Sequence, residues 1–226
     1  ADQQRTYAEL MAASTERARE LASLGLKSGD RLGLLLPNSV AFVELLIAAS
    51  ILGAIVVPMN IRFKTTELAH LIADARMNAI FTTDAIDDVT NFRELLYAAI
   101  PDLKDQTDPT ALRLKDFPEL RAIVVLGESQ PGFMEAKELA ARAAGTPLPE
   151  TDETSPSAPL LLMYTSGTTA NPKACVISNR AFIRTALSLA DRYSITADDI
   201  WWCPLPMFHL GGLLFMTLMF TRAGFY

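Results

Sequence analysis

The sequence predicts an α/β fold in which mostly parallel strands are flanked by helices. Four short runs, 31–37, 54–58, 78–83 and 121–127, are almost entirely apolar, without the alternation of a half-exposed strand. Such runs are typical of strands that are buried on both faces of a parallel sheet. Helix-length segments separate them, and this alternation of strand and helix is the pattern of α/β proteins. With 226 residues, the chain is long enough to bury a large core.

The first helix is expected to begin at a capping box. Thr6 and Glu9 are three residues apart, so each side chain can accept a hydrogen bond from the other residue's backbone N–H. Gly25 marks the end of this helix, because glycine commonly follows a helix terminus. After the strand at 31–37, Asn38 or Ser39 is expected to cap a helix over 41–52. The elements expected next are a strand at 54–58, a helix from Thr65 or Thr66 to Asp74, a strand at 78–83, a helix within 88–100, a strand at 121–127 and a helix within 133–145.

Residues 146–159 are predicted to be a linker between two parts of one domain, 1–145 and 160–226. This stretch, TPLPETDETSPSAP, concentrates Pro, Thr, Ser and acidic residues. The second part is expected to contain strands at 160–165 and 174–178, a helix that Ser178 caps, and an apolar helix from about Leu210. The sequence starts without Met and ends at RAGFY, from which we expect an incomplete amino-terminal domain, with a carboxy-terminal domain absent.

The charge and hydropathy of the chain argue against nucleic acid or membrane as its partner. Twenty Lys and Arg oppose 26 Asp and Glu, for a net charge of −6, and no basic cluster stands out. The longest apolar runs, 45–57 and 210–220, are shorter than the roughly 18 to 20 residues that span a bilayer. No signal-peptide pattern is present at the start, so we expect a cytoplasmic protein. Cys175 and Cys203 lack metal-site spacing and are expected to be buried free thiols.

Residues 164–174, YTSGTTANPKA, place four small hydroxyl side chains, a Gly and a Lys in one loop between two predicted strands. Backbone N–H groups, hydroxyls and one cation suit a triphosphate. The Walker template G-x-x-x-x-G-K-[ST] does not fit, because Pro172 and Ala174 occupy two of its four fixed positions when it starts at Gly167. Composition alone also permits a surface hairpin made of turn-forming residues.

The order of these residues resembles the phosphate-binding signature of the AMP-forming acyl-CoA synthetases, the adenylate-forming superfamily. That signature reads aromatic-Thr-Ser-Gly-Thr-Thr-Gly-x-Pro-Lys-Gly, and this chain departs from it at Ala170 and Ala174. Two further blocks support the resemblance: GAIVVPMNIRFKTTELAHLIADA at 53–75, and PLPMFHLGG at 204–212, which resembles the family's second core motif. The resemblance covers the whole chain and implies the fold of an acyl-CoA synthetase amino-terminal domain.

The resemblance also implies a two-step reaction that uses ATP, Mg²⁺ and coenzyme A. A carboxylic acid, fatty or aryl, would react with Mg-ATP to give an acyl-adenylate and pyrophosphate, and the thiol of coenzyme A would then displace AMP. The residues expected to bind ATP are Thr165, Ser166, Gly167, Thr168, Thr169 and Lys173. Thr165 would also help to hold Mg²⁺, with a Glu that this chain lacks.

The PLPMFHLGG block implies the acyl site. His209 would lie near the reacting carboxylate, so Lys173 and His209 are the catalytic candidates. Phe208, Leu210 and Gly211 would border the acyl pocket together with His209. His70 is expected to be structural. The other aromatic and methionine candidates are expected to be buried in the core: Trp201, Trp202, Met207, Met216 and Met219.

Two alternatives remain open. The chain could be a nucleotide- or acyl-binding module without catalysis, or its parent could transfer the acyl group to a carrier protein. The family's Mg²⁺-binding Glu segment and its ribose-binding Gly-Asp are missing, so the isolated chain is expected to be inactive. Because Ala is compatible with negative φ, Ala170 is expected to adopt one. The sequence leaves the oligomeric state open.

Overall fold

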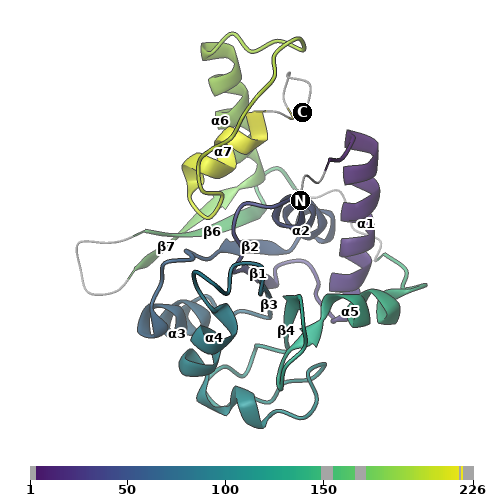
Figure 1. Ribbon diagram of the computed structural model, residues 1–226. Coiled ribbons are helices and arrows are strands. Elements are labelled where there is room, and N and C mark those ends of the chain that lie inside the picture. The colour runs from purple at the N-terminus through teal and green to yellow at the C-terminus, as the bar shows by residue number, and fades with distance from the viewer. Residues whose placement is uncertain (1–3, 149–154, 166–171, 219, 221–226) are drawn as a thin grey trace.

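The computed structural model describes residues 4–148, 155–165, 172–218 and 220. These residues contain a seven-stranded sheet in the order β5-β4-β3-β1-β2-β6-β7, covered by helices on both faces (Figure 1). The strands are β1 (Arg31–Leu34), β2 (Ile55–Pro58), β3 (Ala79–Thr83), β4 (Ala122–Leu126), β5 (Met134–Glu135), β6 (Pro159–Thr165) and β7 (Lys173–Ser178). The helices are α1 (Tyr7–Ser23), α2 (Val40–Leu52), α3 (Thr65–Asp74), α4 (Phe92–Ala99), the 3₁₀ helix η1 (Pro101–Asp105), α5 (Ala136–Ala143), α6 (Asn179–Arg192) and α7 (Leu210–Leu218).

The sheet confirms the predicted fold class. Every neighbouring pair from β5 to β6 is parallel, and only β6 and β7 run antiparallel. The order of the first five strands, read from β2, is that of a doubly wound sheet with its switch point between β1 and β3. Val56 of β2 pairs with Leu161 of β6, so strands from both sides of the predicted linker share one sheet. The division of the chain at that linker remains a prediction.

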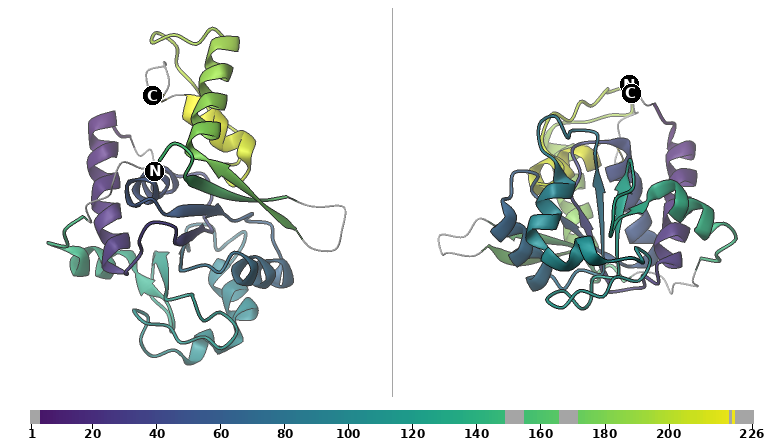
Figure 2. Two further views of the ribbon diagram at one scale, coloured as in Figure 1. Left: turned by 180° about the vertical axis from the view of Figure 1, so that it is seen from behind. Right: turned by 60° about the horizontal axis from the view of Figure 1, so that its bottom comes forward.

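Two apolar clusters lie on opposite faces of the sheet. One cluster joins α1, α2, α5 and α7 to the sheet, and the other joins α3 and α4 to its opposite face. In the right-hand view of Figure 2 the strands lie between α1, in purple, and α3, in blue. Along β6 the side chains alternate: Leu161 and Met163 belong to the first cluster, and Leu162 and Tyr164 contact the second. This alternation decides on which face each site residue lies.

The helix-start signals are confirmed where they are local in sequence. The Thr6 backbone N–H donates to the Glu9 carboxylate at 2.7 Å, and the Glu9 backbone N–H donates to the Thr6 hydroxyl at 3.2 Å. Ser39 caps α2 and Ser178 caps α6. The helix predicted within 133–145 starts only at Ala136, because the preceding residues pair with β4 as the short strand β5.

Two expectations about burial are wrong. Cys175 is exposed, because β7 is an edge strand, and Cys203 is half-buried. Trp202 is 80% exposed, whereas Trp201 packs against Phe215 with ring centroids 5.6 Å apart. The expected burial of Met207 and Met216 is confirmed, and Met219 lies outside the described residues.

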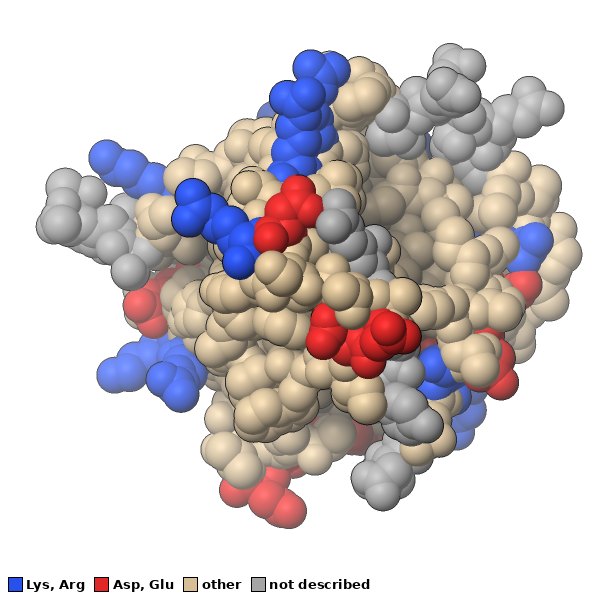
Figure 3. All heavy atoms as spheres, turned by 90° about the horizontal axis from the view of Figure 1, so that it is seen from above, with Lys and Arg blue, Asp and Glu red and all other residues tan. Residues whose placement is uncertain are grey.

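The surface of the described residues carries mixed charge. On the face shown in Figure 3, Lys and Arg side chains are interspersed with Asp and Glu, without a continuous basic field. No helix in the described part of the chain is both long and apolar enough to cross a membrane.

Candidate functional site

Two paired strand ends flank the stretch that is predicted to bind phosphate. Thr165 ends β6 and Lys173 begins β7, and the two residues are directly opposite in the antiparallel register. The Thr165 hydroxyl donates a long hydrogen bond, 3.4 Å, to the Lys173 carbonyl oxygen. The prediction of two strands around this loop is confirmed, and a strand at Lys173 excludes the helix that a Walker loop requires. Ala170 lies outside the described residues. So do four of the predicted ATP-binding residues: Ser166, Gly167, Thr168 and Thr169.

Thr165 and Lys173 lie on the same face of the sheet as the second predicted motif. Met163, two residues before Thr165, belongs to the α1/α2 cluster, and side chains two residues apart in a strand share a face. Met207 belongs to this cluster, and Leu210 packs against it. The structure thus brings Thr165 and Lys173 together as a pair, with the His209 segment on the same side. Among the described residues, no hydrogen bond or ring contact joins Lys173 to His209.

The chemistry of this pair suits phosphate better than a complete magnesium site. Lys173 is exposed and forms no ion pair within the part of the chain that the structure describes, so its ammonium can meet an anion. Thr165 is exposed and offers one hydroxyl oxygen. Mg²⁺ is usually held by one or two carboxylates as well as by phosphate oxygens. No cluster of three or more His, Cys, Asp or Glu suited to a metal occurs in the described ranges. These residues therefore fit the triphosphate and supply only part of a Mg²⁺ site.

Tyr164 anchors the start of the loop to a neighbouring helix. Its hydroxyl donates to the Asp74 carboxylate at 2.5 Å, and Asp74 is the last residue of α3. Burial raises the pKa of the Tyr164 hydroxyl, and the Asp74 carboxylate raises it further. The partial negative charge at the carboxyl terminus of a helix destabilises a carboxylate there. The hydrogen bond from the Tyr164 hydroxyl offsets this effect at Asp74. The neutral phenol thus joins the last turn of α3 to the residue that precedes Thr165.

His209 lies at the start of α7, at the end of a tight turn. Its backbone N–H donates to the Pro206 carbonyl at 3.1 Å, and its carbonyl accepts from the Leu213 N–H at 3.1 Å. The imidazole is exposed and packs against the ring of Phe208, with centroids 4.6 Å apart. It forms no hydrogen bond with another described residue. Phe208 itself is 6% exposed, so its ring supports the histidine from the core.

The first turn of α7 brings the predicted acyl-pocket residues side by side. Leu210 is half-buried against the core, and Gly211 is exposed with no other atom within 4 Å of where a Cβ would stand. A Cβ on the next residue, Gly212, would be 2.0 Å from the Pro206 carbonyl oxygen. The absence of a side chain at Gly212 therefore allows the turn at Pro206 to close on α7.

Sequence reasoning missed the role of Asn38. It was one of two candidates for the cap of α2, but Ser39 makes that cap. The Asn38 amide nitrogen donates to the Leu205 carbonyl at 2.8 Å, and its amide oxygen accepts from the Met207 N–H at 2.8 Å. The only sequence signal was an extra polar residue between strand and helix, which does not identify a partner 167 positions away.

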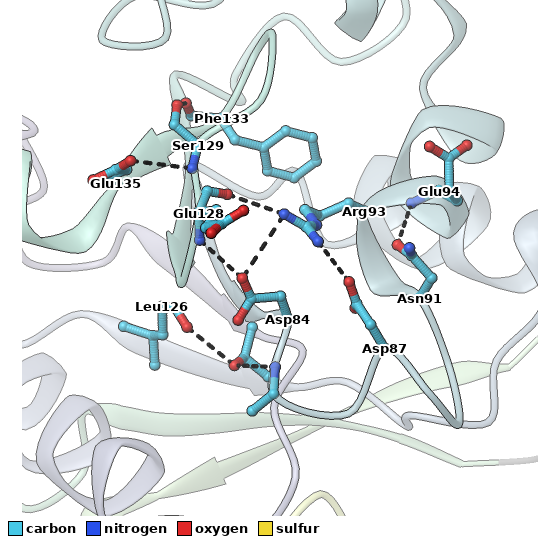
Figure 4. A network of polar contacts seen from close by, with 12 residues as sticks. Asp84, Asp87, Asn91, Arg93, Glu94, Leu126, Glu128, Ser129, Phe133 and Glu135 are labelled. Carbon is cyan, nitrogen blue, oxygen red and sulfur yellow. Dashed lines mark hydrogen bonds and ion pairs between the residues drawn. The ribbon is translucent and has the colours of Figure 1, made fainter.

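A second polar region lies at the carboxyl ends of β3 and β4 (Figure 4). There Arg93 pairs with Asp87 at 2.5 Å and donates to the Glu128 carbonyl at 3.1 Å, while the Glu128 N–H donates to Asp84 at 2.8 Å. An open cavity of about 560 Å³ adjoins it, lined by Asp84, Leu126, Gly127, Glu128, Ala136 and Lys137. Because Arg93 binds both Asp87 and the Glu128 carbonyl while Asp84 accepts from the Glu128 N–H, this network holds the β3 and β4 loops together.

Two curated relatives match nearly the whole chain. It is 30% identical to the long-chain-fatty-acid–CoA ligase FadD13 of Mycobacterium tuberculosis, over 97% of this chain and 38% of that protein. It is 31% identical to the fatty acid–[acyl-carrier-protein] ligase ScoC of Streptomyces coeruleorubidus, over 96% of this chain and 37% of that protein. The chain thus spans little more than a third of the length of the curated relatives it matches.

The fold and the family model agree with these relatives. The structure superposes on apo MbtA of Mycobacterium smegmatis with a TM-score of 0.78 and 28% identity, over 100% of this chain and 39% of that one. The model of the AMP-binding enzyme family matches residues 1–225. The chain therefore belongs to the family of AMP-binding enzymes.

Proposed function

We propose that this chain supplies the phosphate loop and part of the acyl site of an AMP-forming ligase that activates a carboxylic acid. The observation that carries the proposal is the pairing of β6 with β7, which sets Thr165 opposite the exposed Lys173 at the two ends of the TSGTT-x-x-PK stretch. Membership of the AMP-binding family supports this assignment. In the overall reaction, a carboxylate oxygen attacks the α-phosphorus of ATP, the bond to pyrophosphate breaks, and a thiol then displaces AMP and loses its proton.

In this proposal Lys173 and the loop hydroxyls act through charge and position. The Lys173 ammonium offsets the negative charge that accumulates on pyrophosphate as the bond breaks, the kind of stabilisation that commonly dominates catalysis. Thr165 would help to hold the same phosphates through its hydroxyl, and also Mg²⁺, which would neutralise part of the phosphate charge. The exposed imidazole of His209, held against Phe208, orients the carboxylate of the acid.

The acid is proposed to be fatty, with an aryl acid as the other class suited to the apolar helix that follows His209. The names of FadD13 and ScoC both specify a fatty acid, but they differ in the acceptor. Coenzyme A is the proposed acceptor here, and the ScoC name makes a carrier-protein thiol the second candidate. We refer to a protein that contains this chain together with the remaining region of its relatives as the full-length enzyme. The isolated chain is proposed to lack activity.

The test is acid-dependent release of pyrophosphate by the full-length enzyme across a panel of fatty and aryl acids. We expect release with at least one acid, and a loss of ATP use in Lys173→Ala. Lys115→Ala is the matched control, because Lys115 is also an exposed lysine and lies far along the chain, beyond η1. Equal effects of the two substitutions would contradict the role of Lys173. ATP binding without pyrophosphate release for any acid would favour the binding-module alternative.

A further inference from the structure

Asn38 connects the end of the β1 segment to the turn before His209. Both hydrogen-bonding groups of its side chain are used on one short segment: the nitrogen on the Leu205 carbonyl and the oxygen on the Met207 N–H, each at 2.8 Å. An amide side chain offers a donor and an acceptor in one plane. Asn38 therefore fixes both the position and the direction of this backbone segment.

The clamped segment is short and is held on its other side by α7. The Pro206 carbonyl accepts the His209 N–H at 3.1 Å, and the space beside that carbonyl is filled by the backbone of Gly212. Only Phe208 separates Met207 from His209, and consecutive Cα atoms are about 3.8 Å apart. A displacement of the clamped backbone is therefore passed directly to His209.

Asn38 is not required for the local helix. The N-terminus of α2 is capped by Ser39, whose hydroxyl accepts from the Phe42 N–H at 3.2 Å. Asn38 is also exposed, and hydrogen bonds at the surface add little to stability because water replaces them. The interaction is thus better placed to orient the turn than to hold the fold together.

We propose that Asn38 is a positioning residue for the acyl site: it fixes the 205–207 turn and thereby sets where His209 meets the carboxylic acid. This inference rests on the proposed function of His209. Loss of the clamp should reduce kcat/KM for the acid, because small misplacements of a reacting group lower the rate strongly. The KM for ATP should change little, since Thr165 and Lys173 are held by the pairing of β6 with β7 and not by the 205–207 turn.

Hydrogen exchange at the Met207 amide tests the clamp without any activity. In Asn38→Ala this amide should exchange faster than in the wild type, because its acceptor is gone. Ser39→Ala is the matched control: it removes the neighbouring cap of α2 and leaves the Met207 acceptor in place, so exchange at Met207 should stay slow. Unchanged exchange at Met207 in Asn38→Ala would overturn the inference.

Steady-state kinetics of the full-length enzyme test the consequence. For Asn38→Ala we expect kcat/KM for the acid to fall by about tenfold or more, and the KM for ATP to stay within about twofold of the wild-type value. Ser39→Ala should keep the wild-type kcat/KM for the acid. An unchanged kcat/KM for the acid, with faster Met207 exchange, would overturn the positioning role alone. If the wild-type enzyme released no pyrophosphate with any acid, the proposed function would fail and the positioning role with it, whatever the exchange result. Should Asn38→Ala not fold, Asn38→Asp, which also removes the donor to Leu205, takes its place in the kinetic test.

Discussion

Adding one methyl group at Gly212 should displace the turn that carries His209. The ideal Cβ would be 2.0 Å from the Pro206 oxygen and 2.4 Å from its carbonyl carbon, whereas ordinary contact begins at 3.4 Å. Either Pro206 or the first turn of α7 must therefore move by about 1.4 Å, the difference between 3.4 and 2.0. Such overpacking costs about 1–3 kcal/mol, and the better helix propensity of Ala offsets up to about 1 kcal/mol of this cost.

Gly211→Ala is the matched control, because the same change one residue earlier meets no atom within 4 Å. We expect Gly211→Ala to leave the free energy of unfolding unchanged or raise it by up to about 1 kcal/mol. Because both variants share the gain in helix propensity, Gly212→Ala should be less stable than Gly211→Ala by the overpacking cost, about 1–3 kcal/mol. Equilibrium unfolding in urea measures both variants in the isolated chain. In the full-length enzyme, Gly212→Ala should also reduce kcat/KM for the acid. The reasoning is refuted if Gly212→Ala is as stable as Gly211→Ala.

Three further predictions concern the loop and the charges of the core. Lys173→Ala should raise the KM for ATP more than that for the acid, since its ammonium is proposed to bind phosphate; the reverse order in steady-state kinetics would contradict the assignment. Ala170→Gly should lower stability slightly and leave ATP turnover within about tenfold, or about 1.4 kcal/mol of barrier; a gain of several hundredfold would mean that Ala disables the loop. Burial raises the pKa of Glu20 above 4.5 despite its pairing with Arg17. As the pH falls, Glu20 is therefore protonated at a higher pH in the folded state than in the unfolded state, and this stabilises the folded state. Urea unfolding between pH 7 and pH 4.5 should show the wild type gaining stability relative to Glu20→Gln, and a loss would contradict the sign.

Local signals in the sequence predicted most of the elements. These signals act within a few residues of each helix end: the capping box at Thr6, the caps at Ser39 and Ser178, and the glycines after α1 and α2. The solid apolar runs were sufficient for a parallel sheet. Short strands such as β5 could not be predicted, because a two-residue strand exists only through its pairing with β4.

The site was predicted where it depends on residue order and missed where it depends on long-range contacts. The strand–loop–strand arrangement around Lys173 followed from the apolar runs on each side. The contact between Tyr164 and Asp74 joins positions 90 apart, and the Asn38 contacts join positions 167 and 169 apart. Periodicity carries no information about such pairs. The exposure of Cys175 likewise depends on β7 being the edge of the sheet.

Acid-dependent exchange of labelled pyrophosphate into ATP tests the central claim most directly, because it requires reversible formation of an acyl-adenylate. The full-length enzyme should catalyse this exchange with at least one fatty or aryl acid, and Lys173→Ala should reduce it strongly. The isolated 226-residue chain should not catalyse it. Exchange that proceeds equally without any acid, or ATP consumption that yields ADP and phosphate in place of AMP and pyrophosphate, would contradict the assignment of this chain to an acid-activating, AMP-forming ligase.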